Sequence, residues 1–174
     1  MNDEPAASEE TLVRARDAHR ALAENGMTCA TAESLTGGLI GARLTAVPGA
    51  SATYRGGVVV YATDTKAGAL GVPEDLLAEH GAVHPDVAAH MAGGVRQLMS
   101  ADVGLAVTGV AGPEPQDGKP VGTVHAAVVT SGGVFAREFR FTGDRSGIRD
   151  RTVEEALVLL VSALEGNVAK NTRP

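Results

Sequence analysis

The chain has 174 residues and a mass of 17.7 kDa, a length typical of a single domain. Its formal net charge of −6 argues against a protein that coats nucleic acid, because such proteins need a basic face. Aromatic residues make up only 3% and Trp is absent, so a packed core must rely on Ala, Val and Leu.

The N-terminal residues, the length of the apolar stretches and the cysteine content limit the possible cellular locations. The first ten residues are polar and acidic, without the basic start and apolar run of a secretory signal. No stretch reaches the roughly 18 apolar residues that a membrane span needs. Cys29 is the single cysteine, which excludes an internal disulfide and suits a core position. We therefore expect a cytoplasmic protein without a membrane partner.

Hydrophobic periodicity predicts alternating helices and strands along the first two thirds of the chain. In chain order the predicted segments are a helix over 8–25, a strand over 27–32, a helix over 39–44, a strand over 56–61, helices over 62–71, 74–80 and 84–98, and a strand over 103–107. Ser8 is the expected N-cap of the first helix, and Gly26 its end. The Val-rich strand over 56–61 should be buried, and its opening glycines, Gly56 and Gly57, indicate a close approach by a neighbouring strand or by a ligand.

The last third of the chain has a different pattern. The predicted elements are an exposed loop over 114–120, strands over 121–129 and 134–141 that form a hairpin, and a final helix capped by residues 142–147. We predict a disordered tail over 1–7, one domain over 8–166 and a polar tail over 167–174. Strands that first alternate with helices and then form a hairpin predict an α/β fold, a mixed β-sheet with helices on both faces.

Polar residues follow several predicted strands at the point where each strand ends. Ser34, Tyr61 with Lys66, and Thr108 lie at or just beyond such ends, where sheets of this class bind ligands. A serine becomes a useful nucleophile only if a base takes its proton. The histidines read as helical or, for His125, as mid-strand, so Lys66 is the better candidate, since a desolvated lysine can lose its proton near neutral pH.

Each of these residues also has a purely structural interpretation that the sequence leaves open. Ser34 fits a helix N-cap, Lys66 a solvated helical position, and Tyr61 a half-buried aromatic. The backbone N–H groups of Thr108 and Gly109 fit an oxyanion or phosphate site, or an ordinary turn. We find no metal-ligand spacing and no standard nucleotide fingerprint.

Eight short runs occur in order over nearly the whole chain. They are TAESLTGG at 31–38, VPGAS at 47–51, GGVVVY at 56–61 with Lys66 after it, LGVP at 70–73, HGAV at 80–83, TGVAGP at 108–113, KPVGTV at 119–124 and GDR at 143–145. Together they resemble the CinA C-terminal domain family of nicotinamide mononucleotide deamidases. Two departures stand out: Leu35 replaces the usual Cys, and the loop over 114–119 lacks the usual paired glycines.

The resemblance implies a three-layer α/β domain that hydrolyses the carboxamide of nicotinamide mononucleotide to nicotinic acid mononucleotide and ammonia, without a metal or other cofactor. It implies Ser34 as nucleophile and Lys66 as base, with Tyr61 beside them and Ser51, a second serine of the family pattern, as the reserve nucleophile. The implied substrate-binding residues are Thr36, Gly37, Gly38, Thr108, Gly109 and Arg145. A homo-oligomer is also implied, with a small-molecule pyridine nucleotide as its ligand.

A second interpretation keeps the fold but not the chemistry. In it the chain is a catalytically silent nucleotide- or phosphate-binding module, and Ser34, Thr36, Gly37 and Gly38 cradle a phosphate at the start of a helix. The two interpretations differ in whether Ser34 reacts or only binds.

Overall fold

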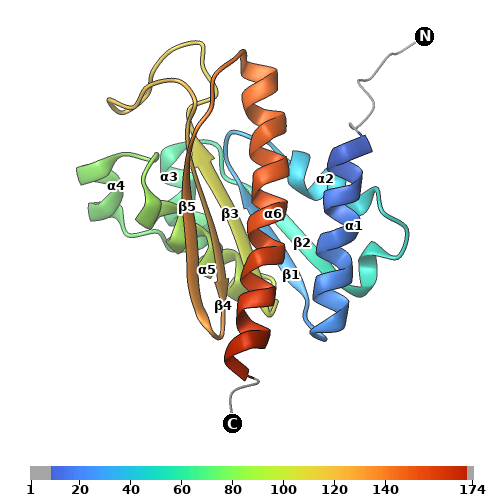
Figure 1. Ribbon diagram of the computed structural model, residues 1–174. Coiled ribbons are helices and arrows are strands. Elements are labelled where there is room, and N and C mark those ends of the chain that lie inside the picture. The colour runs from blue at the N-terminus through green and yellow to red at the C-terminus, as the bar shows by residue number, and fades with distance from the viewer. Residues whose placement is uncertain (1–8, 172–174) are drawn as a thin grey trace.

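A five-stranded mixed sheet forms the middle layer of the computed structural model, which describes residues 9–171 (Figure 1). The strands are β1 (Cys29–Glu33), β2 (Tyr54–Val59), β3 (Val103–Gly109), β4 (Thr123–Thr130) and β5 (Gly133–Arg140), in the spatial order β2-β1-β3-β4-β5. β1 pairs in parallel with β2 and β3, whereas β3, β4 and β5 pair antiparallel. The predicted α/β fold with a mixed sheet is thus confirmed.

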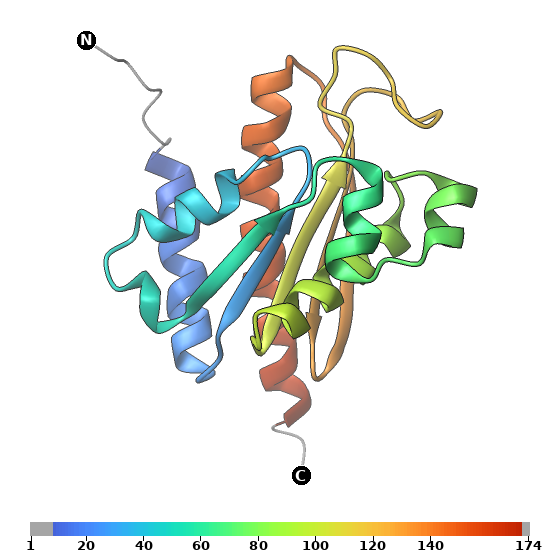
Figure 2. The same cartoon turned by 180° about the vertical axis from the view of Figure 1, so that it is seen from behind.

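Helices cover both faces of this sheet (Figures 1 and 2). One layer holds α1 (Glu9–Glu24), α2 (Leu39–Thr45) and α6 (Arg145–Asn171), and the other holds α3 (Thr63–Leu70), α4 (Glu74–His80) and α5 (Pro85–Leu98). A short 3₁₀ turn, η1 (Ala50–Ala52), precedes β2. No helix of the described residues combines the length and apolarity that crossing a membrane requires.

The central strands are buried on both faces because each lies between two neighbours and between two helical layers. Cys29 of β1 packs with the α1 and α6 side, while Ala30 and Ala32 pack with the α5 side. Small residues let α5 lie close to the sheet. A Cβ at Gly104 of β3 would overlap the carbonyl oxygen of Ala92 on α5.

The second strand departs from the prediction. β2 lies at the sheet edge and its residues alternate between partly buried and exposed, with Val59 half exposed, so the prediction of a buried strand is wrong. An edge strand has one neighbour only and lacks the cover that a central strand receives. The close approach at Gly57 is made by the hydroxyls of Thr31 and Tyr54, which are 2.7 Å apart, and not by a ligand site.

The last helix extends beyond its predicted end. α6 begins after Asp144, whose Oδ1 accepts from Gly147 N–H at 2.8 Å as the capping segment predicted, but the helix continues through residue 166 to Asn171. The predicted N-cap Ser8 lies outside the described residues.

Candidate active site

Parallel pairing of the first three strands brings their C-terminal ends to one edge of the sheet. Glu33, the last residue of β1, lies opposite Val59 of β2 and Val107 of β3. The residues that follow these strand ends therefore meet around one small cleft. Among the residues that line it are Ser34, Tyr61 and Thr108.

Ser34 and Lys66 are in direct contact across this edge. Lys66 lies on α3, and its Nζ donates to Ser34 Oγ at 3.2 Å. Ser34 lies in the turn between β1 and α2, where its N–H donates to Val107 O at 3.2 Å. The Lys66 side chain is fully buried, and Ser34 is 8% exposed. A hydroxyl and an amine at hydrogen-bond distance, shielded from water, are the parts of an activated serine nucleophile.

The surroundings of Lys66 destabilise its charged form. Burial of the ammonium lowers the pKa of Lys66 from 10.5 to about 8, against the opposing charges of Asp117 and Asp64. Nζ also donates to Val60 O at 2.8 Å and to Tyr61 O at 3.3 Å. A neutral amine has two N–H groups and one lone pair, so these two carbonyls hold the N–H groups and leave the lone pair facing Ser34 Oγ. Such an amine can take the serine proton.

The cleft beside Ser34 has a volume of about 90 Å³, room for a small group such as a carboxamide at its base. Gly109 forms part of its wall. The next N–H along the chain, that of Val110, donates to Thr123 O on β4, so by strand alternation the Gly109 N–H faces the β1 side of the sheet. The Thr108 hydroxyl, in contrast, donates to Ala82 O at 2.7 Å and ties the strand end to the segment after α4.

Arg145 and Tyr61 form the rim. Arg145 Nη1 donates to Gly112 O at 2.6 Å and Nη2 donates to the Tyr61 hydroxyl at 2.9 Å. Both side chains are exposed, so the guanidinium can reach a bound anion. The loop between β3 and β4 is exposed as predicted, yet it contributes Glu114 and Gln116 to the cleft.

The side chain of Glu33 binds the turn after Ser34, where a phosphate was the alternative expectation. The buried carboxylate of Glu33 accepts from the Thr36 hydroxyl at 2.6 Å and from Gly38 N–H at 3.0 Å. Thr36 is fully buried, and neither Gly37 nor Gly38 lines the cleft. The structure thus does not bring these three residues, predicted to bind substrate, into the cleft. Glu33 binds the Thr36 hydroxyl and the Gly38 N–H, and the Gly37 N–H donates to Ser34 O at 3.0 Å.

Ser51 lies far from this edge. It is exposed on η1, which precedes the N-terminal end of β2, whereas Ser34 follows the C-terminal end of β1. Since the two strands are parallel, a strand of six residues, about 20 Å, separates the two serines. Within this chain Ser51 does not meet Lys66.

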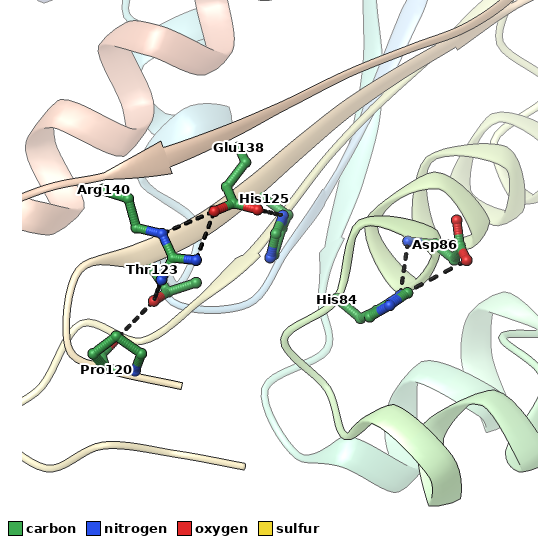
Figure 3. A network of polar contacts seen from close by, with 7 residues as sticks. All are labelled: His84, Asp86, Pro120, Thr123, His125, Glu138 and Arg140. Carbon is green, nitrogen blue, oxygen red and sulfur yellow. Dashed lines mark hydrogen bonds and ion pairs between the residues drawn. The ribbon is translucent and has the colours of Figure 1, made fainter. Parts of the chain in front are cut away.

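Two of the histidines, His84 and His125, take structural positions. His84 caps α5, its Nδ1 accepting from Asp86 N–H at 3.2 Å (Figure 3). His125 is buried in the middle of β4 with Nδ1 3.9 Å from Glu138 Oε2, and Arg140 holds that carboxylate (Figure 3). Burial lowers the pKa of His125, against the charge of Glu138. Within residues 9–171, no group of three or more His, Cys, Asp or Glu side chains is close enough to hold a metal ion.

Two residues that contact the Ser34 turn were missed in the sequence. Arg149 of α6 donates from Nε to Leu35 O at 3.0 Å and from Nη2 to Thr36 O at 3.1 Å. No sequence signal connects Arg149 to a turn 114 positions earlier. Glu33 carried a signal, an acidic residue at the end of an otherwise uncharged strand, but its role depends on where its carboxylate points.

Comparisons with known proteins agree on one family. Residues 12–164 match the family model described as the CinA C-terminal domain. A "CinA-like protein" of Frankia casuarinae is 54% identical over 145 residues, which are 83% of this chain and 34% of that protein. The chain spans about a third of the length of such curated relatives.

Solved structures show the same fold. The crystal structure of competence/damage inducible protein CihA from Agrobacterium tumefaciens has a TM-score of 0.85 and 39% identity, covering 90% of this chain and 96% of that one. A CinA superfamily protein from Klebsiella pneumoniae has a TM-score of 0.86 and 36% identity, covering 90% and 98% of the two chains.

Proposed function

This chain belongs to the CinA C-terminal domain family, and we propose that it is an amidohydrolase that converts nicotinamide mononucleotide to nicotinic acid mononucleotide and ammonia. The observation that carries the proposal is the contact of 3.2 Å between Lys66 Nζ and Ser34 Oγ, made by a fully buried lysine. A buried lysine destabilises a protein unless its charge is paired, so a buried lysine without an ion-pair partner is a candidate for a functional role. Here it faces a serine and two carbonyl groups.

The reaction follows from this pair. Ser34 Oγ attacks the carboxamide carbon while Lys66 Nζ takes the hydroxyl proton, which forms a tetrahedral intermediate. The N–H of Gly109, which lines the same cleft as Ser34, stabilises the negative oxygen of that intermediate. Lys66 then returns the proton to the departing nitrogen, which leaves as ammonia. Lys66 next takes a proton from a water molecule as that water attacks the acyl-enzyme, and it returns the proton to Ser34 Oγ as the ester bond breaks, which frees Ser34 and the acid product.

Charge on the cleft lining supports a nucleotide of this class. The two charged residues that line it, Glu114 and Arg145, have opposite signs. Nicotinamide mononucleotide carries a cationic pyridinium ring and an anionic phosphate. In our proposal Arg145 binds the phosphate at the rim and Glu114 lies on the side of the ring. Tyr61, held by Arg145, covers the same rim.

The silent binding module remains the second candidate, because the family names of the relatives state no chemistry. One observation weakens it. The donors of its phosphate cradle at Thr36 and Gly38 are already bound to Glu33. An anion site would then depend on other donors of the cleft, such as Arg145 and the Gly109 N–H.

Ammonia release from nicotinamide mononucleotide, with the acid product identified by chromatography, tests the proposal. We expect Ser34→Ala and Lys66→Ala to lose at least about 10³-fold in kcat, as removal of a nucleophile or its base does. Full activity in both variants would refute the serine/lysine mechanism. Tight binding without turnover by the unmodified chain would favour the binding module. Ser51→Ala is the matched control, a serine removed outside the cleft.

The proposal also includes a homo-oligomer in the cytoplasm that needs no cofactor. Light scattering of the purified chain tests the first point, and activity after exhaustive treatment with a chelator tests the last. A monomer at all concentrations, or activity abolished by the chelator and restored by a metal, would contradict these parts.

A further inference from the structure

Glu33 is a buried acidic residue that directly precedes the proposed nucleophile, Ser34. It is the last residue of β1 and is 2% exposed. A buried carboxylate is destabilising unless several donors satisfy it. Its oxygens accept four hydrogen bonds from the turn and from the start of α2. The donors are the Thr36 hydroxyl at 2.6 Å and the N–H groups of Gly38 at 3.0 Å, Ile40 at 3.1 Å and Gly41 at 2.9 Å.

These bonds close a loop around Ser34. The main chain of Glu33 is fixed in the sheet, opposite Val59 and Val107, while its side chain reaches past Ser34 to the far end of the turn. Ser34 therefore lies between two points that one residue holds in place. The strand fixes one side and the carboxylate fixes the other.

Arg149 holds the same turn through the opposite type of group. Glu33 binds donors of the turn, whereas the guanidinium of Arg149 binds two of its carbonyl oxygens, those of Leu35 and Thr36. Because Arg149 lies on α6, it ties the turn to the helical layer in front of the sheet (Figure 1). A Cβ at Gly37 would lie 3.6 Å from Arg149 Nη2, so the guanidinium packs directly on the turn.

We propose that Glu33 and Arg149 are positioning residues that hold Ser34 Oγ at hydrogen-bond distance from Lys66 Nζ. The inference rests on the proposed function, because it assigns the turn to the reaction of Ser34. The contact between Ser34 Oγ and Lys66 Nζ joins the turn after β1 to helix α3. The two residues are 32 positions apart in the sequence, so the contact depends on the positions of both elements. A displacement of about 1 Å in such a pair costs on the order of a hundredfold in rate.

Glu33→Gln is the first variant, because glutamine has the same shape and an uncharged amide. Its NH₂ group cannot accept a hydrogen bond, so either Gly41 N–H or the three donors at Oε2 lose their acceptor. We expect kcat to fall by about tenfold to a hundredfold while KM changes by less than about threefold. Thr45→Val is the matched control. It removes a hydroxyl that bonds to Gly41 O at the other end of the same helix, and it should keep wild-type kcat.

A second readout does not depend on the substrate. Diisopropyl fluorophosphate phosphorylates an activated serine by displacement of fluoride as the serine proton leaves, and mass spectrometry measures the rate at Ser34. We expect the rate to fall in Glu33→Gln and in Arg149→Met, which removes the bonds from the other side, and to stay unchanged in Thr45→Val. If Glu33→Gln does not fold, Arg149→Met and Thr36→Val carry the test.

The outcomes separate the two proposals. A wild-type chain that labels at Ser34 but does not hydrolyse nicotinamide mononucleotide refutes the function, and the labelling rates of the variants still decide the positioning roles. Variants with a lowered melting temperature but wild-type kcat and labelling rate would show that Glu33 and Arg149 only stabilise the fold, which overturns the inference. A wild-type Ser34 that is never labelled overturns it as well.

Discussion

The pH dependence of turnover tests the role of Lys66 most directly. With a pKa of about 8, the neutral amine makes up about 1% of Lys66 at pH 6, about 9% at pH 7 and half at pH 8. We therefore expect kcat/KM to rise about tenfold from pH 6 to pH 7 and to level off above pH 8. An ordinary lysine with a pKa of 10.5 would give a rise that continues beyond pH 9.5. Initial rates of ammonia release between pH 6 and 9.5 measure the profile.

Lys66→Arg is the matched perturbation, since arginine keeps the positive charge but does not lose its proton in this range. We expect activity below about a thousandth of wild type at every pH, with no rise toward pH 8. A wild-type profile that is flat or falls between pH 6 and 8, or substantial activity in Lys66→Arg, would refute the assignment of Lys66 as base.

Burial of Lys66 also makes the free energy of unfolding depend on pH. The folded pKa of Lys66 lies below the unfolded value of 10.5, so between pH 8 and 10.5 the unfolded chain binds more protons. The free energy of unfolding should rise over that window by at most about 3 kcal/mol, and the full cost is present below pH 8. Lys66→Met lacks this titration. Urea denaturation at pH 7 and pH 10 gives the free energy of unfolding of both chains. The difference between wild type and Lys66→Met should increase from pH 7 to pH 10, and an equal pH dependence in both chains would contradict the prediction.

Three further predictions follow from particular contacts. Ser51→Ala should keep kcat within about twofold, because Ser51 lies at the far end of β2, and a loss above about a hundredfold would make Ser51 the nucleophile instead. Arg145→Gln should raise KM for nicotinamide mononucleotide about tenfold through loss of a charge-assisted contact, with little effect on nicotinamide riboside, which has no phosphate; equal effects on both would exclude a phosphate contact. Gly57→Ala should lower the free energy of unfolding by about 1–3 kcal/mol in urea titrations, because its Cβ would overlap the Thr31 and Tyr54 hydroxyls, and wild-type stability would show that these side chains move aside without cost.

The prediction of one shared edge succeeded for a topological reason. Parallel strands joined by helices all end on the same side of a sheet, so a polar residue after each apolar run is enough to predict that Ser34 and Thr108 meet. The prediction that β2 is buried failed for a different reason. A Val-rich run looks alike at the centre and at the edge of a sheet, and only strand order shows that Val59 is half exposed.

Glycine and serine motifs had the least predictive value. The run after Ser34 has the composition of a phosphate-binding turn, but Glu33 binds its donors from within. Ser51 and Ser34 both match serines of the family pattern, yet they lie at opposite ends of their strands. Composition and spacing show which hydrogen-bonding groups a segment contains, but they do not show which residues those groups contact in the folded chain.

The sequence by itself determined the layer architecture, the family and the edge of the sheet where polar residues gather. Hydrophobic periodicity is a local property that identifies helices and strands, and their order along the chain indicates which strand ends lie on the same edge. Only the tertiary structure decided the state of Lys66 and the content of the Ser34 turn. The low pKa of Lys66 comes from burial among residues brought together from distant parts of the chain. The turn is held by Glu33, at the end of the strand before it, and by Arg149 from the last helix. Burial and long-range hydrogen bonds depend on all neighbours in space, so no local pattern records them.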